Sequence, residues 1–448
     1  MTVEEILNVC NGKLLCGNKE DEVKDFVRDT REVKEGSTFI AIVGENFDGN
    51  NFANQAFENG ANTCIVSKEI EKIDGKNIIL VENTVKAIQQ IAAYKREKSN
   101  IPLVAVTGSV GKTSTKDLIA SVLNQKFKVL KTKGNMNNDI GLPMTILNLE
   151  DEEIMVIEMG MNHFGEISLL TSIAKPNLAV ITNIGTAHIG NLGSRENILK
   201  AKLEILEGLQ GNSIVINNDN DLLSKWNEED KKYNKITYGI ENDSIYQAKE
   251  IKAYTDKSVY TLKSKDEGNG KEIIVPVGGE HFVLNSLCAI AVGRYFNMNY
   301  DEIIKGIANL DLTGKRMEII KSNCGATIIN DTYNANYDSM KAAIEYLKAV
   351  KDKRKIAVLG DMLELGEYSK SLHENVGKCI DNIDILITVG KESEYIAEKA
   401  SAKLIFKFDN NQDAINKIKE LINKDDIILV KASNGMKFID IINTIKEF

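Results

Sequence analysis

Short apolar runs, separated by glycine turns and amphipathic segments, recur along the middle of the chain. Their length and their content of branched residues are typical of strands buried in a parallel sheet. The amphipathic segments between several of them predict helices on both faces of that sheet, and hence an α/β fold. The runs occupy residues 103–106, 154–157, 178–181 and 213–216.

A similar pattern fills the last third of the chain, where strand-like runs again alternate with helical stretches. This alternation predicts a second α/β unit, of the Rossmann type. The two patterns meet near residues 312–316, and a polar, glycine-containing stretch at 263–271 predicts a surface hairpin or loop. The later runs are 327–329, 356–359, 383–389 and 427–430.

The first hundred residues carry β-rich runs at 37–43 and 63–66, with helical spacing at 51–59 between them and a helix expected near 84–98. A chain of 448 residues exceeds what one hydrophobic core usually supports. We therefore expect three domains: a small N-terminal α/β domain (1–98), a central parallel-sheet domain (99–312) and a C-terminal Rossmann-like domain (313–448).

The composition is that of a soluble globular protein, with 43% hydrophobic and 27% charged residues. A net charge of −9 argues against a nucleic-acid-binding protein, which needs clustered Lys and Arg. No apolar run is long enough to cross a bilayer, and the first ten residues, with Glu4 and Glu5, do not resemble a signal peptide. The six cysteines are scattered and complete no zinc site, so we expect free thiols in a cytoplasmic protein.

The strongest motif is Thr-Gly-Ser-Val-Gly-Lys-Thr-Ser at residues 107–114, between an apolar run and a helical stripe. Its glycines let backbone amides face an anion, and the start of a helix adds favourable potential. Lys112 is expected to reach the β- and γ-phosphates of a nucleotide, and Thr113 to bind magnesium. The loop is a shortened P-loop, because Val106 stands where the full motif has its first glycine. A glycine-rich turn without a ligand is the alternative, which the strand–turn–helix setting disfavours.

Two residues beyond strand-like runs are candidate metal ligands. Glu158 ends the run 154–157, and open α/β sheets bind ligands at the carboxyl ends of their strands. His188 lies in the loop that follows the run 178–181. Taken alone, each has a structural alternative: a solvated carboxylate at a strand end, or a loop histidine with no chemical role.

Lys202 lies on the predicted helix 194–209, on the same face as Ile198 and Ile205. Burial among apolar residues lowers the pKa of a lysine amine and favours its neutral form. The alternative is a lysine whose stem packs inside while its amine reaches water.

These motifs occur in the same order as in the Mur ligase family, and the resemblance spans the whole chain. The phosphate loop, the segment 158–160, the loop that ends at His188 and the segment 201–205 resemble the central domain of that family. The segments 331–336 and 360–366, with His373, are similar to the members that add D-alanyl-D-alanine. Other matching segments are 29–31, 135–143, 182–185, 285–289 and 314–318.

The resemblance implies an ATP-dependent ligase that forms an amide bond through an acyl phosphate, with ATP and Mg²⁺ as cofactors. Its substrates would be UDP-N-acetylmuramoyl-tripeptide and D-alanyl-D-alanine, and its product the pentapeptide precursor of peptidoglycan. The first domain would bind the UDP-sugar, the central P-loop-type ATPase domain ATP, and the third domain the acceptor amine. A cytoplasmic monomer, without nucleic acid or membrane insertion, is expected.

Carried over position by position, the resemblance assigns roles to single residues. The catalytic residues would be Lys112, His188 and Lys202, the last one carbamylated. The metal ligands would be Thr113, Glu158, His188 and Lys202. ATP would be bound by Gly108, Ser109, Gly111, Lys112, Thr113, Ser114, Asn285, Arg316 and Asp331. The substrates would be bound by Thr30, Arg31, Asn135, Asn138, Asn334 and Asn336.

Three residues depart from the pattern of the family, namely Tyr337, Ala432 and Asn434. The nearest alternative function is that of another Mur-type ligase, which adds a single amino acid. Its diaminopimelate-adding form carries an Asp-Asn-Pro-Arg motif that this sequence lacks. A nucleotide-gated binding or switch protein is the second alternative. It would explain the phosphate loop, but not the combination of Glu158, His188 and Lys202.

Overall fold

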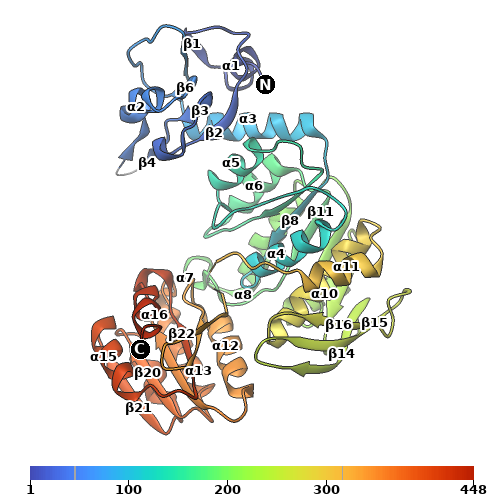
Figure 1. Ribbon diagram of the computed structural model, residues 1–448. Helices are drawn as coiled ribbons and strands as arrows, with labels where there is room; N and C mark the ends of the chain where they lie inside the picture. The colour runs from blue at the N-terminus through green and yellow to red at the C-terminus, as the bar shows by residue number, and fades with distance from the viewer. Residues whose placement is uncertain (45–46, 315) are drawn as a thin grey trace.

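Three β-sheets follow one another along the chain (Figure 1). The computed structural model describes residues 1–44, 47–314 and 316–448, so that Lys315 of the matching segment 314–318 lies outside the described residues. Within this described part, the sheets have five, nine and six strands, and a two-stranded ribbon accompanies the first. Helices pack against all three sheets, which confirms the expected α/β class. The exact domain limits stay predictions.

The N-terminal sheet has four parallel strands and one antiparallel edge strand, in the order β1-β7-β6-β3-β2. The predicted strand 63–66 is confirmed, whereas the run 37–43 is divided between β3 and β4, because the chain turns at Ile42 to accept a hydrogen bond from Gly49. The elements are α1 (Val3–Cys10), β1 (Lys13–Cys16), β2 (Lys24–Val27), η1 (Thr30–Glu32), β3 (Ser37–Ile40), β4 (Val43–Gly44), β5 (Phe47–Asp48), η2 (Gly49–Phe52), α2 (Ala53–Glu58), β6 (Thr63–Val66), β7 (Asn77–Leu80) and α3 (Thr84–Ser99).

The central sheet has the order β16-β15-β14-β13-β12-β11-β8-β10-β9, parallel from β9 to β14 and antiparallel beyond. All four predicted strands lie side by side in it, and the stretch 263–271 forms the β15–β16 hairpin. The elements are β8 (Leu103–Thr107), α4 (Lys112–Leu123), β9 (Val129–Lys131), α5 (Gly141–Leu147), β10 (Ile154–Glu158), α6 (Glu166–Ala174), β11 (Leu178–Ile181), α7 (Ile189–Leu192), α8 (Arg195–Leu203), η3 (Glu204–Leu206), β12 (Ser213–Asn217), α9 (Asp221–Glu229), β13 (Asn234–Gly239), β14 (Tyr246–Ala253), β15 (Ser258–Ser264), β16 (Glu272–Val275), α10 (Glu280–Tyr295) and α11 (Tyr300–Ala308).

The predicted helix 194–209 is shorter than expected, since α8 ends at Leu203 and a single 3₁₀ turn follows. That turn brings the carboxylate of Glu204 to the backbone N–H groups of Gly165 (2.9 Å) and Ser168 (3.2 Å), at the start of α6. A carboxylate at this position satisfies free amides of the helix start. The capping contact therefore explains why the helix stops early.

The C-terminal sheet has the order β17-β18-β22-β19-β20-β21, with β17 antiparallel and the others parallel. Its four predicted strands are confirmed as β18, β19, β20 and β22. The elements are β17 (Glu318–Lys321), β18 (Thr327–Asn330), α12 (Tyr337–Ala349), β19 (Arg354–Gly360), η4 (Gly366–Tyr368), α13 (Ser369–Lys378), β20 (Ile385–Val389), α14 (Glu394–Lys399), β21 (Leu404–Phe408), α15 (Asn411–Leu421), β22 (Asp426–Lys431), η5 (Asn434–Met436) and α16 (Ile439–Ile445).

Helix α3 joins the N-terminal sheet to the central domain, and Figure 1 shows it lying between the two. The ammonium of Lys95 donates to the carbonyls of Leu147 and Leu149, both at 2.6 Å, where α5 ends. The guanidinium of Arg96 donates to the carbonyl of Ala174 (2.7 Å), where α6 ends. Cations stabilise the carbonyl end of a helix, so these two side chains fix α3 on the central domain.

The central and C-terminal domains touch through their loops and through α12. The Asp338 carboxylate accepts from the backbone N–H (2.7 Å) and the hydroxyl (2.9 Å) of Thr186. The Tyr368 hydroxyl donates to the carbonyl of Gly193 (2.7 Å), and the Tyr346 hydroxyl to that of Thr255. These polar contacts join the two domains, and the Asp338 side chain lies at the cavity that holds the candidate site.

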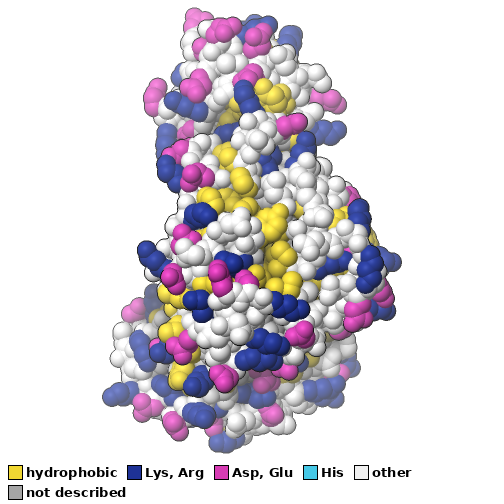
Figure 2. Space-filling model, turned by 90° about the vertical axis from the view of Figure 1, so that its right-hand side faces the viewer, with side chains coloured by type: hydrophobic (Ala, Val, Ile, Leu, Met, Phe, Trp, Pro, Cys, Tyr) yellow, Lys and Arg dark blue, Asp and Glu magenta, His cyan; other side chains and the backbone are white. Residues whose placement is uncertain are grey.

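The surface in Figure 2 carries basic and acidic side chains interspersed, with hydrophobic side chains gathered along the middle of the molecule. None of the helices in the described ranges has the length and apolarity that crossing a membrane requires. The six cysteines are free, as the sequence predicted.

Candidate active site

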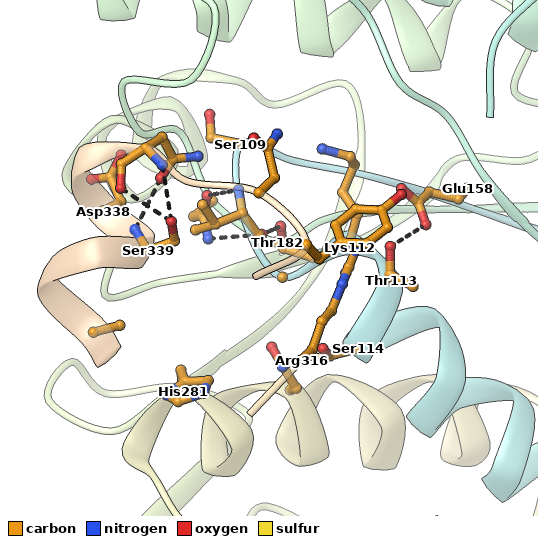
Figure 3. Close-up of a pocket in the computed structure, with 18 of the residues that line it drawn as sticks. Ser109, Lys112, Thr113, Ser114, Glu158, Thr182, His281, Arg316, Asp338 and Ser339 are labelled. Atoms are coloured by element: carbon orange, nitrogen blue, oxygen red, sulfur yellow. Dashed lines mark hydrogen bonds between the residues drawn. The ribbon is translucent and has the colours of Figure 1, made fainter. Parts of the chain in front are cut away.

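A cavity of about 380 Å³ lies between the central and C-terminal domains. Figure 3 shows side chains from both domains directed into it. Its central-domain walls are the phosphate loop, the residues that follow β10 and β11, and the start of α10. The C-terminal domain contributes several side chains of the segment 331–343, though not Tyr337, and the end of β22. The carboxyl ends of several parallel strands thus converge on one space, as in other open α/β sheets that bind ligands.

The phosphate loop has a backbone that depends on its glycines. Gly108 and Gly111 have φ values of +153° and +80°, and a Cβ at Gly108 would lie 1.8 Å from Thr182 Oγ1. No side chain caps the start of α4, which follows Gly111 directly. The positive end of this twelve-residue helix therefore faces the cavity and can bind an anion.

Lys112 lies at that helix start, and its ammonium donates to the carbonyl of Gly108 (2.8 Å). Burial lowers the pKa of this amine, the charge of Glu158 acts in the opposite direction, and Arg316 lowers the pKa further. Two cationic side chains thus act at the start of α4, beside the Glu158 carboxylate. Positive charge at this helix start favours an anionic ligand.

Glu158 ends β10 and is only 2% exposed. One carboxylate oxygen accepts from the Thr113 hydroxyl (2.7 Å), and the other accepts from the side-chain amide of Asn137 (2.8 Å). The backbone N–H of Glu158 donates to the Thr132 hydroxyl (2.9 Å). Asn137 was not singled out in the sequence, although it lies between the predicted residues Asn135 and Asn138.

The pKa values of His188 and Lys202 are both lowered, which favours the neutral form of each side chain. Burial, with the charges of Lys112 and Lys202, lowers the pKa of His188 to about 4. Its Nδ1 lies 3.3 Å from Glu364 Oε2, outside hydrogen-bond geometry, and has no hydrogen-bond partner within the described residues. Lys202 is 2% exposed, and burial, followed by the charge of Lys112, holds the pKa of its amine well below the usual value. Of the two alternatives that the sequence left open for Lys202, the structure shows the buried side chain, and the alternative of an amine that reaches water is wrong.

Helix α10 and the linker to the C-terminal domain form another wall of the cavity, beside the phosphate loop. Asn285 accepts from the Thr115 hydroxyl (3.0 Å), so its amide N–H₂ remains available to a ligand. The Arg316 guanidinium lies over the Tyr333 ring, 4.1 Å from its centroid. His281 also lines this wall, and burial lowers its pKa to about 4. The amide of Asn285 and the ring of His281 are groups that suit contact with a nucleotide base.

Asp331 forms an ion pair with Lys431, with 2.6 Å between Oδ2 and Nζ, and both line the cavity. Lys431 also donates to the carbonyl of Asn334 (2.9 Å). The sequence placed Lys431 at the end of a strand but gave it no partner. The pairing follows from the parallel register of β18 and β22, whose carboxyl ends lie together.

Most of the residues assigned from the resemblance line this cavity, while some lie elsewhere. Gly108 and Lys202 are adjacent to its wall rather than in it, and Asn135 is exposed outside it. Thr30 and Arg31 lie in the N-terminal domain, where Asp29 binds the backbone and guanidinium of Arg31. The lining residues are Ser109, Gly111, Lys112, Thr113, Ser114, Asn138, Glu158, His188, Asn285, Arg316, Asp331, Asn334 and Asn336.

The three departures from the family pattern have separate structural settings. Tyr337 begins α12 and does not line the cavity; burial and nearby Cys379 raise the pKa of its phenol. Ala432 is buried against residue 360, whose lack of a side chain leaves room for the alanine methyl group. Asn434 is exposed at the start of η5.

Sequence models of known families match three parts of the chain. The model described as "Mur ligase family, catalytic domain" matches residues 27–98, and "Mur ligase middle domain" matches residues 106–293. The model described as "Mur ligase, glutamate ligase domain" matches residues 315–434. These matches include β3, β6 and β7 of the first sheet, the phosphate loop and the strands of the C-terminal sheet.

Relatives resemble the chain over almost their whole length. A UDP-N-acetylmuramoyl-tripeptide–D-alanyl-D-alanine ligase of Bacillus subtilis is 39% identical over 457 residues, covering 100% of this chain and 98% of the relative. A solved structure of MurF from Acinetobacter baumannii has a TM-score of 0.90 and 29% identity, covering 99% of this chain and 98% of that one. A MurF ligase from Thermotoga maritima, solved in complex with ADP, has a TM-score of 0.83 and 31% identity, covering 95% and 97%.

Proposed function

The chain belongs to the Mur ligase family, and on this premise we propose that it joins D-alanyl-D-alanine to UDP-N-acetylmuramoyl-tripeptide at the expense of ATP. The observation that carries the proposal is the full-length similarity to ligases named for this reaction, together with a cavity that brings the phosphate loop to the C-terminal domain. The product would be the pentapeptide precursor of peptidoglycan, with ADP and phosphate.

ATP is proposed to lie along the cavity, with its phosphates at the start of α4 and its base near Asn285 and His281. The amides of the phosphate loop and the ammonium of Lys112 would contact the β- and γ-phosphates. Arg316, held on Tyr333, would contribute a further positive charge. The ADP complex of the Thermotoga maritima relative supports a nucleotide site in this fold.

The residues present also fit a magnesium ion. Glu158 offers a buried carboxylate next to the Thr113 hydroxyl, and His188 has a buried ring nitrogen without a partner among the described residues. Within the same residues, His, Cys, Asp and Glu form no group of three that could hold a metal alone, so phosphate oxygens would complete the coordination. When bound, magnesium would neutralise charge on the β- and γ-phosphates.

The proposed reaction has two steps. A carboxylate oxygen of the tripeptide attacks the γ-phosphorus, the bond to the β,γ-bridging oxygen breaks, and ADP leaves with an acyl phosphate remaining. The amine of the dipeptide then attacks the acyl carbon through a tetrahedral intermediate, which loses phosphate and a proton to give the amide. Lys112 and Arg316 stabilise the negative charge that develops on the transferred group. Contacts such as Asp338 to Thr186 join the two domains beside the cavity, and closure of the domains around the substrates would exclude water.

Lys202 is proposed to be carbamylated, because burial lowers the pKa of its amine and so favours the neutral form, and only a neutral amine attacks carbon dioxide. In that step the amine nitrogen bonds to the carbon of CO₂ and releases one proton, which leaves a carbamate anion. The anion would lie near the cationic Lys112 and balance its charge. It would also supply a further oxygen ligand for the magnesium ion, in addition to Glu158.

The roles proposed for the substrate-binding residues rest on the resemblance to the Mur ligase family. The N-terminal domain, with Thr30 and Arg31, would hold the UDP-sugar, and Asn135 and Asn138 would face its diphosphate. Asn334 and Asn336 would lie near the acceptor, although the Asn336 side chain already accepts from the N–H of Ser339 (2.9 Å). We further propose that the enzyme works as a monomer in the cytoplasm.

Acceptor-dependent phosphate release tests the proposal. Purified protein with ATP, Mg²⁺ and UDP-N-acetylmuramoyl-tripeptide is expected to release phosphate rapidly only when D-alanyl-D-alanine is present. A nucleotide-gated switch would hydrolyse ATP at the same rate with or without the dipeptide. Release that ignores both the tripeptide and the dipeptide would therefore overturn the ligase proposal.

A further inference from the structure

Asp117 lies on α4, one helical turn after Thr113, and its carboxylate is fully buried. Its Oδ1 accepts from Lys131 Nζ (2.8 Å) and from the Thr313 hydroxyl (2.9 Å), and its Oδ2 accepts from the backbone N–H of Thr313 (2.8 Å). Lys116 Nζ lies 3.2 Å from Oδ1. One buried carboxylate thus joins the nucleotide-binding helix, strand β9 and the segment that leads to the C-terminal domain.

A buried carboxylate is stable only when its charge is matched. Burial acts to raise the pKa of Asp117, but Lys116, Lys131 and the Thr313 amide outweigh it and hold the pKa below its usual value. The group is therefore an anion with all its contacts made inside the protein. None of these contacts faces the cavity, so the phosphate site does not explain why the charge is there.

Thr313 stands at the point where the chain leaves the central domain, between the end of α11 and the start of β17. Gly314 follows it with φ +86°, a conformation that a side chain disfavours. Arg316 comes three residues after Thr313, a distance that extended chain covers in at most about 10 Å. Fixing Thr313 on α4 therefore limits where the Arg316 guanidinium can reach.

The linker also has space into which it could move. Arg316 and Met317 line the candidate site on one side and, on the other, a second cavity of about 570 Å³. Leu312 and Gly314 line that second cavity as well. Without a fixed point, the segment could shift away from the phosphates into this space.

Lys116, the buried lysine beside Asp117, is connected to Glu158, a proposed metal ligand. Lys116 Nζ donates to the carbonyl of Thr132 (2.8 Å), and the Thr132 hydroxyl accepts from the backbone N–H of Glu158. The Lys116–Asp117 pair therefore contacts Thr313, which precedes Arg316 in the linker, and Thr132, which binds the backbone of Glu158. A shift of α4 would thus move the linker and the end of β10 together.

We propose that Asp117 is a positioning residue, which ties the start of the interdomain linker to the phosphate-binding helix and so holds Arg316 at the phosphate end of the cavity. The inference rests on the proposed function, because it takes the ligand of the cavity to be ATP. Its chemistry is that of an anchor: Asp117 touches no substrate and acts through Thr313 and Arg316.

The test is a double-mutant cycle between Thr313 and Arg316, since Asp117→Asn would leave the buried Lys116 and the half-buried Lys131 unmatched and could prevent folding. Thr313→Val removes the anchoring hydroxyl and keeps the branched shape and the backbone N–H. We expect kcat for ligation to fall roughly 2- to 10-fold, the range that one hydrogen bond supports, and Thr313→Ser to restore it. In an Arg316→Ala background, Thr313→Val should cause no further loss.

Thr84→Val is the matched control, because Thr84 is a buried threonine whose hydroxyl donates one bond (3.0 Å, to Ala41) far from the linker. Its effect should simply add to that of Arg316→Ala. If Thr313→Val leaves kcat unchanged, or if its loss adds fully to that of Arg316→Ala, the anchor proposal is wrong. Affinity for a non-hydrolysable ATP analogue, measured by calorimetry over the same cycle, needs no ligation. If the effects of the two substitutions on this affinity are additive, the anchor proposal is wrong even where ligation is confirmed. If they are not additive, the proposal is supported even where the enzyme uses a different acceptor.

Discussion

The Thr113 hydroxyl donates a 2.7 Å hydrogen bond to Glu158, so the first turn of α4 and the end of β10 meet at one point before any ligand is bound. Both are proposed metal ligands, and Asn137 holds the second oxygen of the same carboxylate at 2.8 Å. The carboxylate is therefore oriented by the protein rather than by the ion. A residue such as Asn137, which would not bind the metal itself, can therefore affect the metal affinity by orienting Glu158.

Asn137→Ala is expected to weaken the Mg²⁺ dependence of ligation without unfolding the protein. Loss of an outer hydrogen bond to a metal-binding carboxylate typically costs 10- to 100-fold in metal affinity. The apparent Mg²⁺ constant, measured by phosphate release at saturating ATP, should rise by that factor. Asn148→Ala, at an exposed asparagine beyond α5, serves as the control and should leave the constant unchanged.

Lys112→Ala should abolish most ligation while the fold is kept. The change removes the ammonium that stabilises charge on the β- and γ-phosphates, and loss of one such group typically costs 10²- to 10³-fold in kcat. Initial rates and melting curves of wild type, Lys112→Ala and the exposed control Lys126→Ala would show this. Near wild-type activity with a normal melting curve would contradict the phosphate-loop assignment.

Local patterns were sufficient to predict the strands and the phosphate loop. The runs at 63–66 and 178–181 match β6 and β11, because buried parallel strands are short and continuously apolar. Glu158, Lys112 and Thr113 were predicted because each belongs to one strand or one helix start. The helical spacing around Lys202 left a buried amine and one that reaches water both open, and the structure decides for the buried amine.

Contacts between distant segments could not be derived in this way. Asn137 meets Glu158 only because the loop after β9 folds back over β10, and Lys431 meets Asp331 because β18 and β22 are neighbours. The end of α8 at Leu203 depends on Glu204 reaching the start of α6, which no periodicity reveals. The contact between Asp117 and Thr313 likewise joins a helix of the central domain to the start of the segment that leads to the C-terminal domain.

Lys202 should carry a carbamate in the active enzyme. Carbon-13 NMR with labelled bicarbonate is expected to show a carbamate signal that is lost in Lys202→Ala. That variant should lose most activity, and a short free carboxylic acid should restore part of it by filling the vacated space. Lys200→Ala, an exposed lysine on the same helix, should keep both the signal and the activity. Full activity with an unmodified amine at mildly alkaline pH would refute the modification.

The stability of the protein should fall as the pH drops from about 6.5 to about 4. Burial lowers the pKa of His188 and His281 to about 4, so the folded protein keeps both neutral where the unfolded chain binds protons. The unfolded state is thus favoured below the ordinary histidine pKa, by up to roughly 3 kcal/mol per histidine. Urea unfolding at pH 7 and pH 5 should show a smaller difference for His281→Gln than for wild type. An equal difference would show that His281 is not held neutral.

The choice of acceptor is the sharpest consequence of the proposed function. D-Alanyl-D-alanine should be ligated in preference to single amino acids such as diaminopimelate or lysine, because Asn334 and the Tyr333 phenol offer hydrogen bonds at the carboxyl end of β18. A dipeptide backbone can use such groups, whereas diaminopimelate would require a charged clamp. Tyr337, the departure nearest this segment, does not line the cavity, so it should not alter this preference.

Competition between equal concentrations of the acceptors, read by mass spectrometry of the UDP-linked product, decides the question. The dipeptide adduct is expected to dominate in wild type and equally in Tyr337→Pro, which changes the first position of α12, where proline is tolerated. A change of acceptor in Tyr337→Pro would mean that this residue shapes the pocket after all. If a single amino acid dominates in wild type, the enzyme is the other kind of Mur-type ligase, and the hydrogen-bonding groups of residues 331–336 serve a different acceptor.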